Sequence, residues 1–343
     1  MSHEASIIIP IYNEINSLNI LSSKLKDTFK HLNIKYIFID DGSKDGSLNW
    51  LKNNLELFFS KKEFELIILP KNYGKGYAIK EGIKKAIGKY SIFLDSDLEY
   101  EPRDLLEMYN VILENNNIEV LHGSRNLGSK TQMRRYFMNK IAVKINTWIF
   151  NFLFNQSLSD LHTGSKIINT DLVKDLNLNT NGFGLEIVMS SEIAKKNINI
   201  FEYGISYYER TVEQGKKITF ADGIISYYFL FRERFLKNDF PTQISILYSF
   251  LFMTYAGTYF GMGSGKILVI LFFMIIGLMI ALNRKIIQLS LIFFLIYAGS
   301  LFSKGNGRIY TVIIFFLIGL YLSKKIKKYF LMIKSNFITR FLF

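Results

Sequence analysis

The sequence contains no cysteine, which excludes disulfide bonds and any chemistry that depends on a thiolate. Its four histidines, His3, His31, His122 and His162, do not show the HxxxH spacing that is typical of zinc ligands. Acidic residues are absent from Pro241 to the C-terminus, whereas eleven lysines and arginines occur there. The first 240 residues hold all 29 acidic residues and the other 31 basic ones, so most of the formal charge of +13 belongs to the C-terminal part.

This basic excess lies between and after long apolar runs, which favours a membrane over a nucleic acid as the partner. The runs are Ile244–Phe260, Ile267–Leu282, Ile286–Phe302 and Ile309–Leu322. Each is somewhat shorter than the ~20 residues of a full span, but almost no polar face interrupts them, unlike core helices of a soluble domain. We therefore predict transmembrane helices within residues 244–325. Four spans is the first interpretation, and three is the alternative because Thr254 and Gly257 weaken the first run.

The charged connections indicate the orientation. With four spans, the Asn283–Lys285 loop and the Lys324–Lys328 segment share one side with the N-terminal region, which the positive-inside rule places in the cytoplasm. We thus expect an integral protein of the inner or plasma membrane with a basic cytoplasmic tail at residues 326–343. Met1–Ser6 lead directly into an apolar strand, so no signal peptide is expected. Aromatic and arginine residues within Ile224–Leu236 predict an interfacial juxtamembrane helix, which we place within residues 221–243.

Short apolar strands alternate with helical segments in residues 1–220. Strands are expected at Ser6–Ile9, Tyr36–Ile39, Glu65–Leu69, Ile92–Leu94 and Glu119–His122. Helices are expected at Asn16–His31, Ser47–Phe59, Tyr77–Ala86 and Pro102–Asn115. This alternation predicts one α/β domain with a mostly parallel sheet, in which ligands bind at the carboxyl ends of the strands.

Polar residues follow several of these strands. Asp95 and Asp97 end the strand that contains Phe93, and residues at i and i+2 of an extended segment project from the same face. Two such carboxylates suit a hard divalent cation that also contacts substrate phosphates. Each polar cluster alone is equally compatible with a helix cap or a turn. Acids at several strand ends are harder to explain in that way, because gathered at one edge they would repel one another without a cation.

The ordered motifs closely resemble those of the inverting family-2 glycosyltransferases with a GT-A fold, in particular the polyprenyl-phosphate glycosyltransferases, including dolichyl-phosphate mannose synthase. The resemblance covers about Ser6 to Arg234. Its motifs are Ile9–Glu14, Ile39–Gly46, Lys71–Gly76, Asp95–Glu99, Gly123–Arg125 and Tyr207–Thr211 with Gly215–Ile218.

The resemblance implies roles for individual residues. The nucleotide-sugar would be bound by Pro10, Tyr12, Glu14, Asp40, Asp41, Lys75, Asp95 and Ser96. Mg²⁺ or Mn²⁺ would be held by Asp97, with Asp95 and Glu99. The donor or acceptor phosphates would be bound by Arg125, Arg134, Arg210 and Lys217. Catalysis would rest on Asp95, Asp97, Arg125 and Asp160.

Two positions depart from the pattern of the family. After Phe183-Gly184, relatives often carry two acids as Glu-x-Glu, whereas this chain has Glu186 and then Val188. In the segment Asp160–Gly164, Gly164 and Ser165 replace aromatic or cysteine residues. Asp160 is therefore interpreted either as catalytic or as a turn cap, and a catalytic role for Glu186 stays open. In residues 131–154, arginines are interspersed with aromatic residues, which favours an amphipathic membrane-surface segment over an ordinary domain helix.

We therefore expect a metal-dependent membrane enzyme that transfers a hexose from a UDP- or GDP-sugar to undecaprenyl or dolichyl phosphate with inversion. One alternative is a membrane glycosyltransferase with another lipid or polysaccharide acceptor, although no QxxRW-type motif of processive polymerases occurs. A second alternative is a protein that transports or holds a lipid-linked sugar and has an inactive N-terminal domain. The sequence leaves the sugar, the nucleotide and homo-oligomer formation open.

Overall fold

The computed structural model describes residues 3–237, except 116, 129, 183, 212, 214 and 216–219. The chain divides into two units, Met1–Arg234 and Phe235–Phe343. The predicted membrane helices at 244–325 and the tail at 326–343 lie outside the described residues. Within the described part, none of the helices combines the length and the apolar character that a membrane crossing requires.

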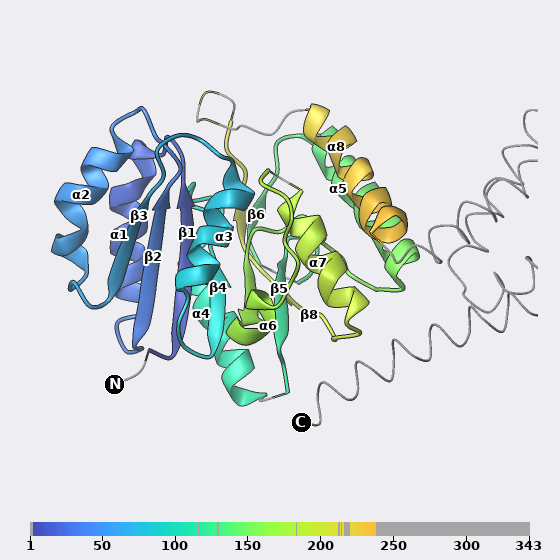
Figure 1. The fold of residues 1–343 in the computed structure, drawn as a ribbon, viewed down its shortest axis with the longest axis horizontal. Helices are drawn as coiled ribbons and strands as arrows, with labels where there is room; N and C mark the ends of the chain where they lie inside the picture. The colour runs from blue at the N-terminus through green and yellow to red at the C-terminus, as the bar shows by residue number, and fades with distance from the viewer. Residues whose placement is uncertain are drawn as a thin grey trace, which may run out of the picture. The chain divides into compact units, whose positions relative to one another are not determined.

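A central sheet of seven strands organises the domain, in the order β3-β2-β1-β4-β7-β5-β8 (Figure 1). Its strands are β1 (Ala5–Ile11), β2 (Ile34–Asp40), β3 (Phe64–Ile68), β4 (Tyr90–Phe93), β5 (Val120–Ser124), β7 (Lys166–Asn169) and β8 (Phe201–Gly204). Only β7 runs antiparallel to its neighbours β4 and β5. The prediction of a mostly parallel α/β sheet is confirmed. A short parallel pair, β6 (Gln132–Met133) with β9 (Tyr207–Tyr208), forms a separate ribbon.

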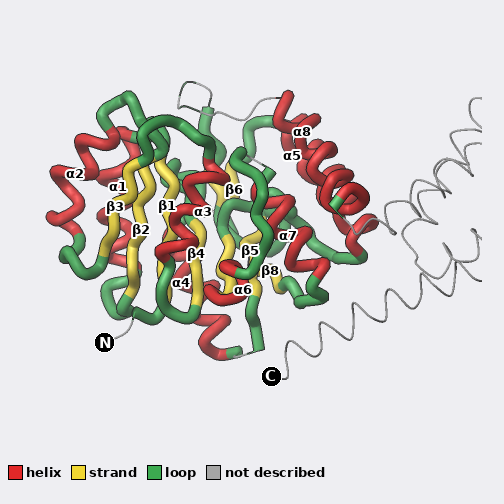
Figure 2. Tube along the Cα trace, viewed as in Figure 1, coloured by secondary structure: helices red, strands yellow, loops and turns green. Residues whose placement is uncertain are grey.

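Helices cover both faces of the sheet, as the red and yellow segments of Figure 2 show. They are α1 (Ile15–Thr28), α2 (Ser47–Phe58), α3 (Lys75–Lys85), α4 (Pro102–Glu114), α5 (Phe137–Phe154), α6 (Thr170–Lys174), α7 (Leu185–Lys195) and α8 (Phe220–Phe231). A five-residue π-helical turn, η1 (Arg232–Leu236), follows α8. The helix expected within 221–243 thus corresponds to α8 and η1 as far as the chain is described.

The alternation of side chains along β1 explains why helices pack on both faces of the sheet. Ile7 and Ile9 belong to a core cluster that includes residues of α1, α2 and α4, whereas Ile8 lies between them in sequence and belongs to a cluster with α3 and α7. A strand buried on both faces favours apolar residues at successive positions, and the middle of β1 is a run of three isoleucines. All three isoleucines are fully buried.

The sheet brings the polar strand ends to one edge. β1 pairs in parallel with β2 and with β4. β4 and β5 also share a direction, because each is antiparallel to β7. The carboxyl ends of β1, β2, β4 and β5 therefore lie at the same edge, which is the upper one in Figure 1. That edge holds most of the residues that the sequence motifs single out.

Candidate active site

The residues that the resemblance assigns to the nucleotide begin at the carboxyl ends of β1 and β2. The carboxylate of Asp41 accepts hydrogen bonds from the backbone N–H groups of Tyr73 and Gly74, at 2.8 and 2.9 Å. Burial raises the pKa of Asp41, and these two hydrogen bonds oppose the shift. Asp40 is fully buried, and one of its carboxylate oxygens has no hydrogen-bond partner among the described residues. The two aspartates thus have different roles: Asp41 fixes the loop before α3, and Asp40 carries unused acceptor capacity.

Gly74 shows why the sequence needs a glycine before α3. Its φ is +97°, and a Cβ at this position would lie 2.5 Å from the backbone oxygen of Asn181. A residue with a side chain would strain the backbone and collide with that loop. The close approach places Lys75, the first residue of α3, against the segment that leads into α7.

Lys75 joins two carboxylates from distant parts of the chain. Its ammonium lies 2.9 Å from an oxygen of Asp95 and 2.8 Å from an oxygen of Glu186. Burial alone would lower the pKa of Lys75, but the charges of Asp95 and Glu186 raise it well above its usual value. The pKa of Glu186 is lowered: burial would raise it, and Lys75 outweighs that effect. Glu186, whose role the sequence left open, is therefore a partner of the site lysine.

The backbone near Asp95 is also constrained. A Cβ at position 164 would collide with the carboxylate of Asp95, so the glycine in Asp160–Gly164 makes room for that side chain. Ser96 donates from Oγ to the backbone oxygen of Pro10 at 2.9 Å, and its own backbone oxygen accepts from Ser17 Oγ at 2.6 Å. Ser96 thus ties the loop after β4 to the end of β1, and Pro10 takes part through its backbone.

Asp97 faces a different cation. Arg210 Nη2 lies 3.2 Å from Asp97 Oδ2, and Nη1 of the same arginine lies 2.8 Å from Glu14 Oε2. Burial, followed by the charges of Asp95 and Glu99, raises the pKa of Asp97 to about 7, although Arg210 opposes the shift. The Asp97 carboxylate is therefore held in a buried position beside other acids as well as beside Arg210.

Glu99 is held by β9 and the residues after it. Its side chain accepts hydrogen bonds from Tyr207 Oη at 2.8 Å and from the backbone N–H of Arg210 at 2.9 Å. The backbone oxygen of Glu99 also accepts from Tyr208 N at 3.0 Å. Glu99 thus links the Asp95–Glu99 loop to the strand that precedes Arg210.

Arg125 and Asp160 form the third charged group of the site. Arg125 Nε and Nη2 donate to the two oxygens of Asp160 at 2.7 and 2.8 Å, and the backbone N–H of Arg125 adds a third bond at 3.0 Å. Burial would raise the pKa of Asp160, but Arg125 lowers it overall. Arg134 donates to the backbone oxygen of Arg125, and both guanidinium groups lie over the ring of Tyr207, at 5.0 and 6.0 Å from its centroid.

A divalent cation fits the chemistry of these donors. Asp97 offers carboxylate oxygens, which are the ligand type that Mg²⁺ and Mn²⁺ prefer, and the carboxylates of Asp95 and Glu99 lie near enough to act on it. Among the described residues, no three histidine, aspartate or glutamate side chains are close enough together to enclose a metal. The donor set therefore matches a metal held by Asp97 and completed by substrate phosphates. Lys217 lies outside the described residues.

The sequence was compared with known proteins. The profile of the family "Glycosyl transferase family 2" matches residues 6–176. An uncharacterized protein of Methanocaldococcus jannaschii is 30% identical over 240 residues, which cover 65% of this chain and 98% of that protein. This chain belongs to glycosyltransferase family 2.

One further relative of this family-2 glycosyltransferase and one solved structure of similar fold carry more specific names. A dolichyl-phosphate beta-glucosyltransferase of Dictyostelium discoideum is 29% identical over 222 residues, which cover 60% of this chain and 66% of that protein. The fold is similar to that of glucosyl-3-phosphoglycerate synthase from Mycobacterium tuberculosis, whose crystal structure contains Mn²⁺, uridine diphosphate and glucosyl-3-phosphoglycerate. The TM-score is 0.51 at 14% identity, over 68% of this chain and 80% of that one, so this likeness supports the GT-A fold alone.

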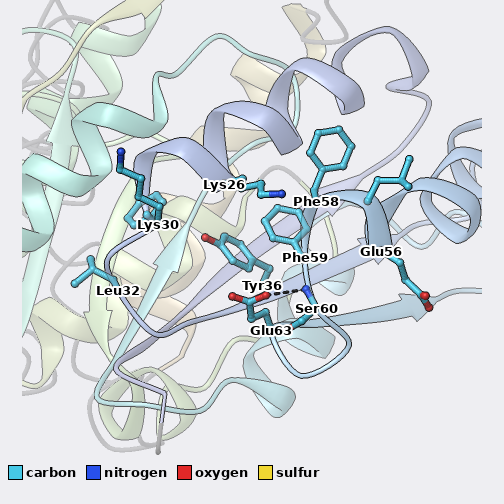
Figure 3. Close-up of a pocket in the computed structure, with 11 residues that line it drawn as sticks. Lys26, Lys30, Leu32, Tyr36, Glu56, Phe58, Phe59, Ser60 and Glu63 are labelled. Atoms are coloured by element: carbon cyan, nitrogen blue, oxygen red, sulfur yellow. Dashed lines mark hydrogen bonds between the residues drawn. The ribbon is translucent and has the colours of Figure 1, made fainter.

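A pocket elsewhere on the glycosyltransferase domain does not coincide with the site. It has a volume of about 470 Å³. Its lining comes from the ends of α1 and α2 and the starts of β2 and β3 (Figure 3). The labelled side chains include Lys26, Lys30, Tyr36, Phe59 and Glu63. Because these residues lie at the amino ends of the strands, the pocket lies away from the edge that carries Asp97.

Several contributors to the site carry no local sequence signal. Tyr100 Oη accepts a hydrogen bond from the backbone N–H of Gly164 at 3.1 Å, and its ring lies 5.5 Å from that of Tyr207. The two rings connect the Arg125 side of the site with the Asp95–Glu99 loop. Lys166, on the antiparallel strand β7, is buried beneath the same region. A tyrosine near a motif and a lysine within a strand are common, so only the tertiary fold identifies these residues.

Proposed function

We propose that this protein transfers a sugar from a nucleoside-diphosphate sugar to a polyprenyl phosphate, with inversion at the anomeric carbon and with a divalent metal bound at Asp97. Membership of family 2 supports glycosyl transfer. The name of the Dictyostelium relative supports a lipid-phosphate acceptor, and the Mn²⁺–UDP complex of the structural neighbour supports a metal and a nucleotide donor.

The choice of acceptor rests on one observation: two carboxylates of the site are each paired with a cation. Asp160 is locked in a forked pair with Arg125, and Glu186 is paired with Lys75. The pKa values of both acids are lowered, which makes them weak proton acceptors. A hydroxyl acceptor needs a general base, whereas a phosphate is already an anion and needs cations to bring it near the donor diphosphate. The site fits the second kind of acceptor.

The chain's own residues would act mainly by binding and orientation. Arg125 presents a fixed guanidinium, which suits the recognition of phosphate oxygens. Lys75 holds Asp95 in place next to the donor. The metal, when bound, would neutralise charge that develops on the leaving diphosphate. Single displacement on the sugar carbon would invert its configuration.

The membrane setting is part of the proposal. Helix α5 exposes Phe137, Met138 and Trp148 at 72%, 71% and 68% of their surface, and α8 exposes Tyr228 and Phe231. Aromatic residues of this kind occur at the headgroup level of membranes. Together with the four apolar runs beyond residue 243, they support an integral membrane protein. The basic loop at Asn283–Lys285 and the basic segment at Lys324–Lys328 support a catalytic domain on the cytoplasmic side.

The test is a donor panel. Purified full-length protein with Mg²⁺ or Mn²⁺ is incubated with UDP- and GDP-sugars and with undecaprenyl or dolichyl phosphate, and the lipid fraction is read by mass spectrometry. A glycosylated lipid phosphate is expected for one donor, and Asp97→Ala should abolish its formation while the protein stays folded. Release of free sugar alone across the panel would reject the lipid acceptor. A glycosylated product with a different acceptor would support the alternative acceptor class.

A further inference from the structure

Arg210 holds two acids that come from different loops of the domain, Glu14 after β1 and Asp97 after β4. It lies 196 residues from Glu14 in the chain and contacts that carboxylate through both Nη1 and Nη2, at 2.8 and 3.3 Å. Its contact with Asp97 is made by Nη2 alone, at 3.2 Å. The side chains of Arg210 and Asp97 are only 18% and 19% exposed. The guanidinium therefore lies directly against the carboxylate that is proposed to bind the metal.

Glu14 and Glu99 hold Arg210 independently of Asp97. Glu14 binds the guanidinium, and Glu99 accepts a hydrogen bond from the backbone N–H of Arg210 and also lies 3.9 Å from its Nε. Glu99 also accepts from Tyr207, which lies on β9 three residues earlier. Loss of the Asp97 contact would thus leave Arg210 anchored at its backbone and to Glu14, and would relieve Nη2 of one acceptor.

A divalent cation at Asp97 and the guanidinium of Arg210 compete for the same carboxylate. Two cations at contact distance repel each other strongly in a partly buried site. A nucleoside diphosphate brings new negative charge, and an arginine fork suits phosphate oxygens as well as it suits carboxylates. When the donor binds with its metal, its diphosphate therefore offers the displaced guanidinium a new anionic partner.

We propose that Arg210 is an exchangeable counter-ion: it pairs with Asp97 in the absence of donor and metal, and moves its Nη2 group to the donor diphosphate when the metal takes Asp97. In this arrangement Glu14 and Glu99 are positioning residues that keep Arg210 within reach. The inference rests on the proposed function, because it needs a metal at Asp97 and a nucleotide donor. It gives Glu99 a role other than that of a metal ligand.

The exchange predicts that removal of Arg210 changes metal affinity and nucleotide affinity in opposite directions. Because binding equilibria are coupled reciprocally, a competitor of the metal lowers its affinity in the empty site. Removal of Arg210 should therefore strengthen metal binding without nucleotide. The same removal should weaken nucleotide binding when metal is saturating, since the diphosphate loses a cation. A purely structural arginine would weaken both.

The experiment measures Mn²⁺ binding to the full-length protein by electron paramagnetic resonance, without nucleotide. Arg210→Gln is expected to bind Mn²⁺ about 10-fold more tightly than the wild type, within the usual range of site coupling. Arg103→Gln is the matched control, because it removes one exposed arginine of α4 and should leave the affinity unchanged. With saturating Mn²⁺, UDP or GDP, whichever the wild type binds more tightly, should bind Arg210→Gln about 10-fold more weakly.

Arg210→Lys keeps the positive charge but loses the fork. It should restore part of the nucleotide affinity and show intermediate Mn²⁺ affinity, and it serves as the test if Arg210→Gln does not fold. Glu99→Ala should weaken nucleotide binding relative to the wild type. Glu99→Gln, which can still accept the hydrogen bonds, should bind the nucleotide and Mn²⁺ as the wild type does. Loss of Mn²⁺ affinity in Glu99→Gln would identify Glu99 as a metal ligand and reject its positioning role.

Different results would reject the exchange of Arg210 and the metal role of Asp97. If Asp97→Asn lowers Mn²⁺ affinity but Arg210→Gln leaves it unchanged or weaker, the exchange is rejected and the proposed function stands. If Asp97→Asn binds Mn²⁺ as the wild type does, the metal role of Asp97 is rejected and the exchange falls with it.

Discussion

Arg125 and Asp160 form a forked ion pair in which two guanidinium nitrogens reach two different carboxylate oxygens, at 2.7 and 2.8 Å. The Asp160 side chain is fully buried, and that of Arg125 is 11% exposed. Asp160 was predicted either as catalytic or as a turn cap, and the pair shows what its carboxylate contacts. It holds the arginine in position, and one of its oxygens also accepts a hydrogen bond from the Arg125 backbone.

The first prediction concerns this pair. Asp160→Asn leaves the guanidinium of Arg125 without its buried counter-charge, so we expect a loss of about 3–5 kcal/mol in the free energy of unfolding. Transfer activity should fall as well, because the fork no longer orients Arg125. Urea unfolding of the purified protein and the transfer assay measure the two effects.

A double variant separates folding from function at the same pair. Arg125→Met with Asp160→Leu removes both charges and fills their space with apolar groups, which often restores stability. We expect near-normal stability and no activity. Recovered activity in the double variant would mean that Arg125 contacts neither donor nor acceptor, and wild-type stability of Asp160→Asn would contradict the structural role of the pair.

The strands and helices at the start of the domain followed from local patterns. The isoleucine run at Ile7–Ile9 indicated a strand, and acids such as Asp95 and Asp97 at strand ends indicated the edge of the site. The confirmed family resemblance was carried by the same motifs. These signals are local, because strand periodicity and turn chemistry act over a few neighbouring residues.

The pairing of charges did not follow from the sequence. Lys75 and Glu186 are 111 residues apart, and their contact depends on how α3 and α7 pack on one face of the sheet. Arg210 reaches Glu14 only because β9 pairs with β6 and Glu99 fixes the next residues. Such partners are chosen by tertiary packing, and any of several acids near each cation was an equal candidate in the sequence.

The second prediction tests Glu186. Glu186→Gln removes one of the two charges that hold Lys75, so Asp95 should lose its fixed position and kcat/KM should fall about 10-fold, as for other residues that orient a site. Glu192→Gln on the same helix is the control, because Glu192 pairs with Lys195 and not with a site residue. Equal rates for Glu186→Gln and the control would show that Asp95 is positioned without Glu186.

The third prediction tests whether α5 meets the membrane. The chain has two tryptophans: Trp148 is 68% exposed on α5 and stacks on Phe152, whereas Trp50 lies on α2 against Phe58. In vesicles with brominated acyl chains, the Trp50→Phe variant should lose much of its fluorescence, because only Trp148 then emits. The Trp148→Phe variant should not be quenched. If only the Trp148→Phe variant is quenched, in which Trp50 emits, then α5 is not the membrane-facing helix.

The fourth prediction concerns the buried lysine of β7. Lys166 is 2% exposed, and its ammonium donates to the backbone oxygen of Thr163. Burial lowers the pKa of Lys166 to about 8, although Glu186 and Asp160 oppose the shift. In the unfolded chain a lysine titrates near its ordinary value of about 10.4. Between these two values the unfolded state binds more protons than the native state.

The sign of the pH effect follows from that difference. Stability rises with pH wherever the unfolded state holds more protons, by at most about 1.4 kcal/mol per pH unit for one group. The wild type should therefore gain stability relative to Lys166→Met as the pH rises from 7 to 9.5. Tyrosines with raised pKa values, such as Tyr109, are common to both proteins and cancel in the comparison. Urea unfolding at several pH values measures the difference, and a difference independent of pH would mean that Lys166 keeps its proton despite burial.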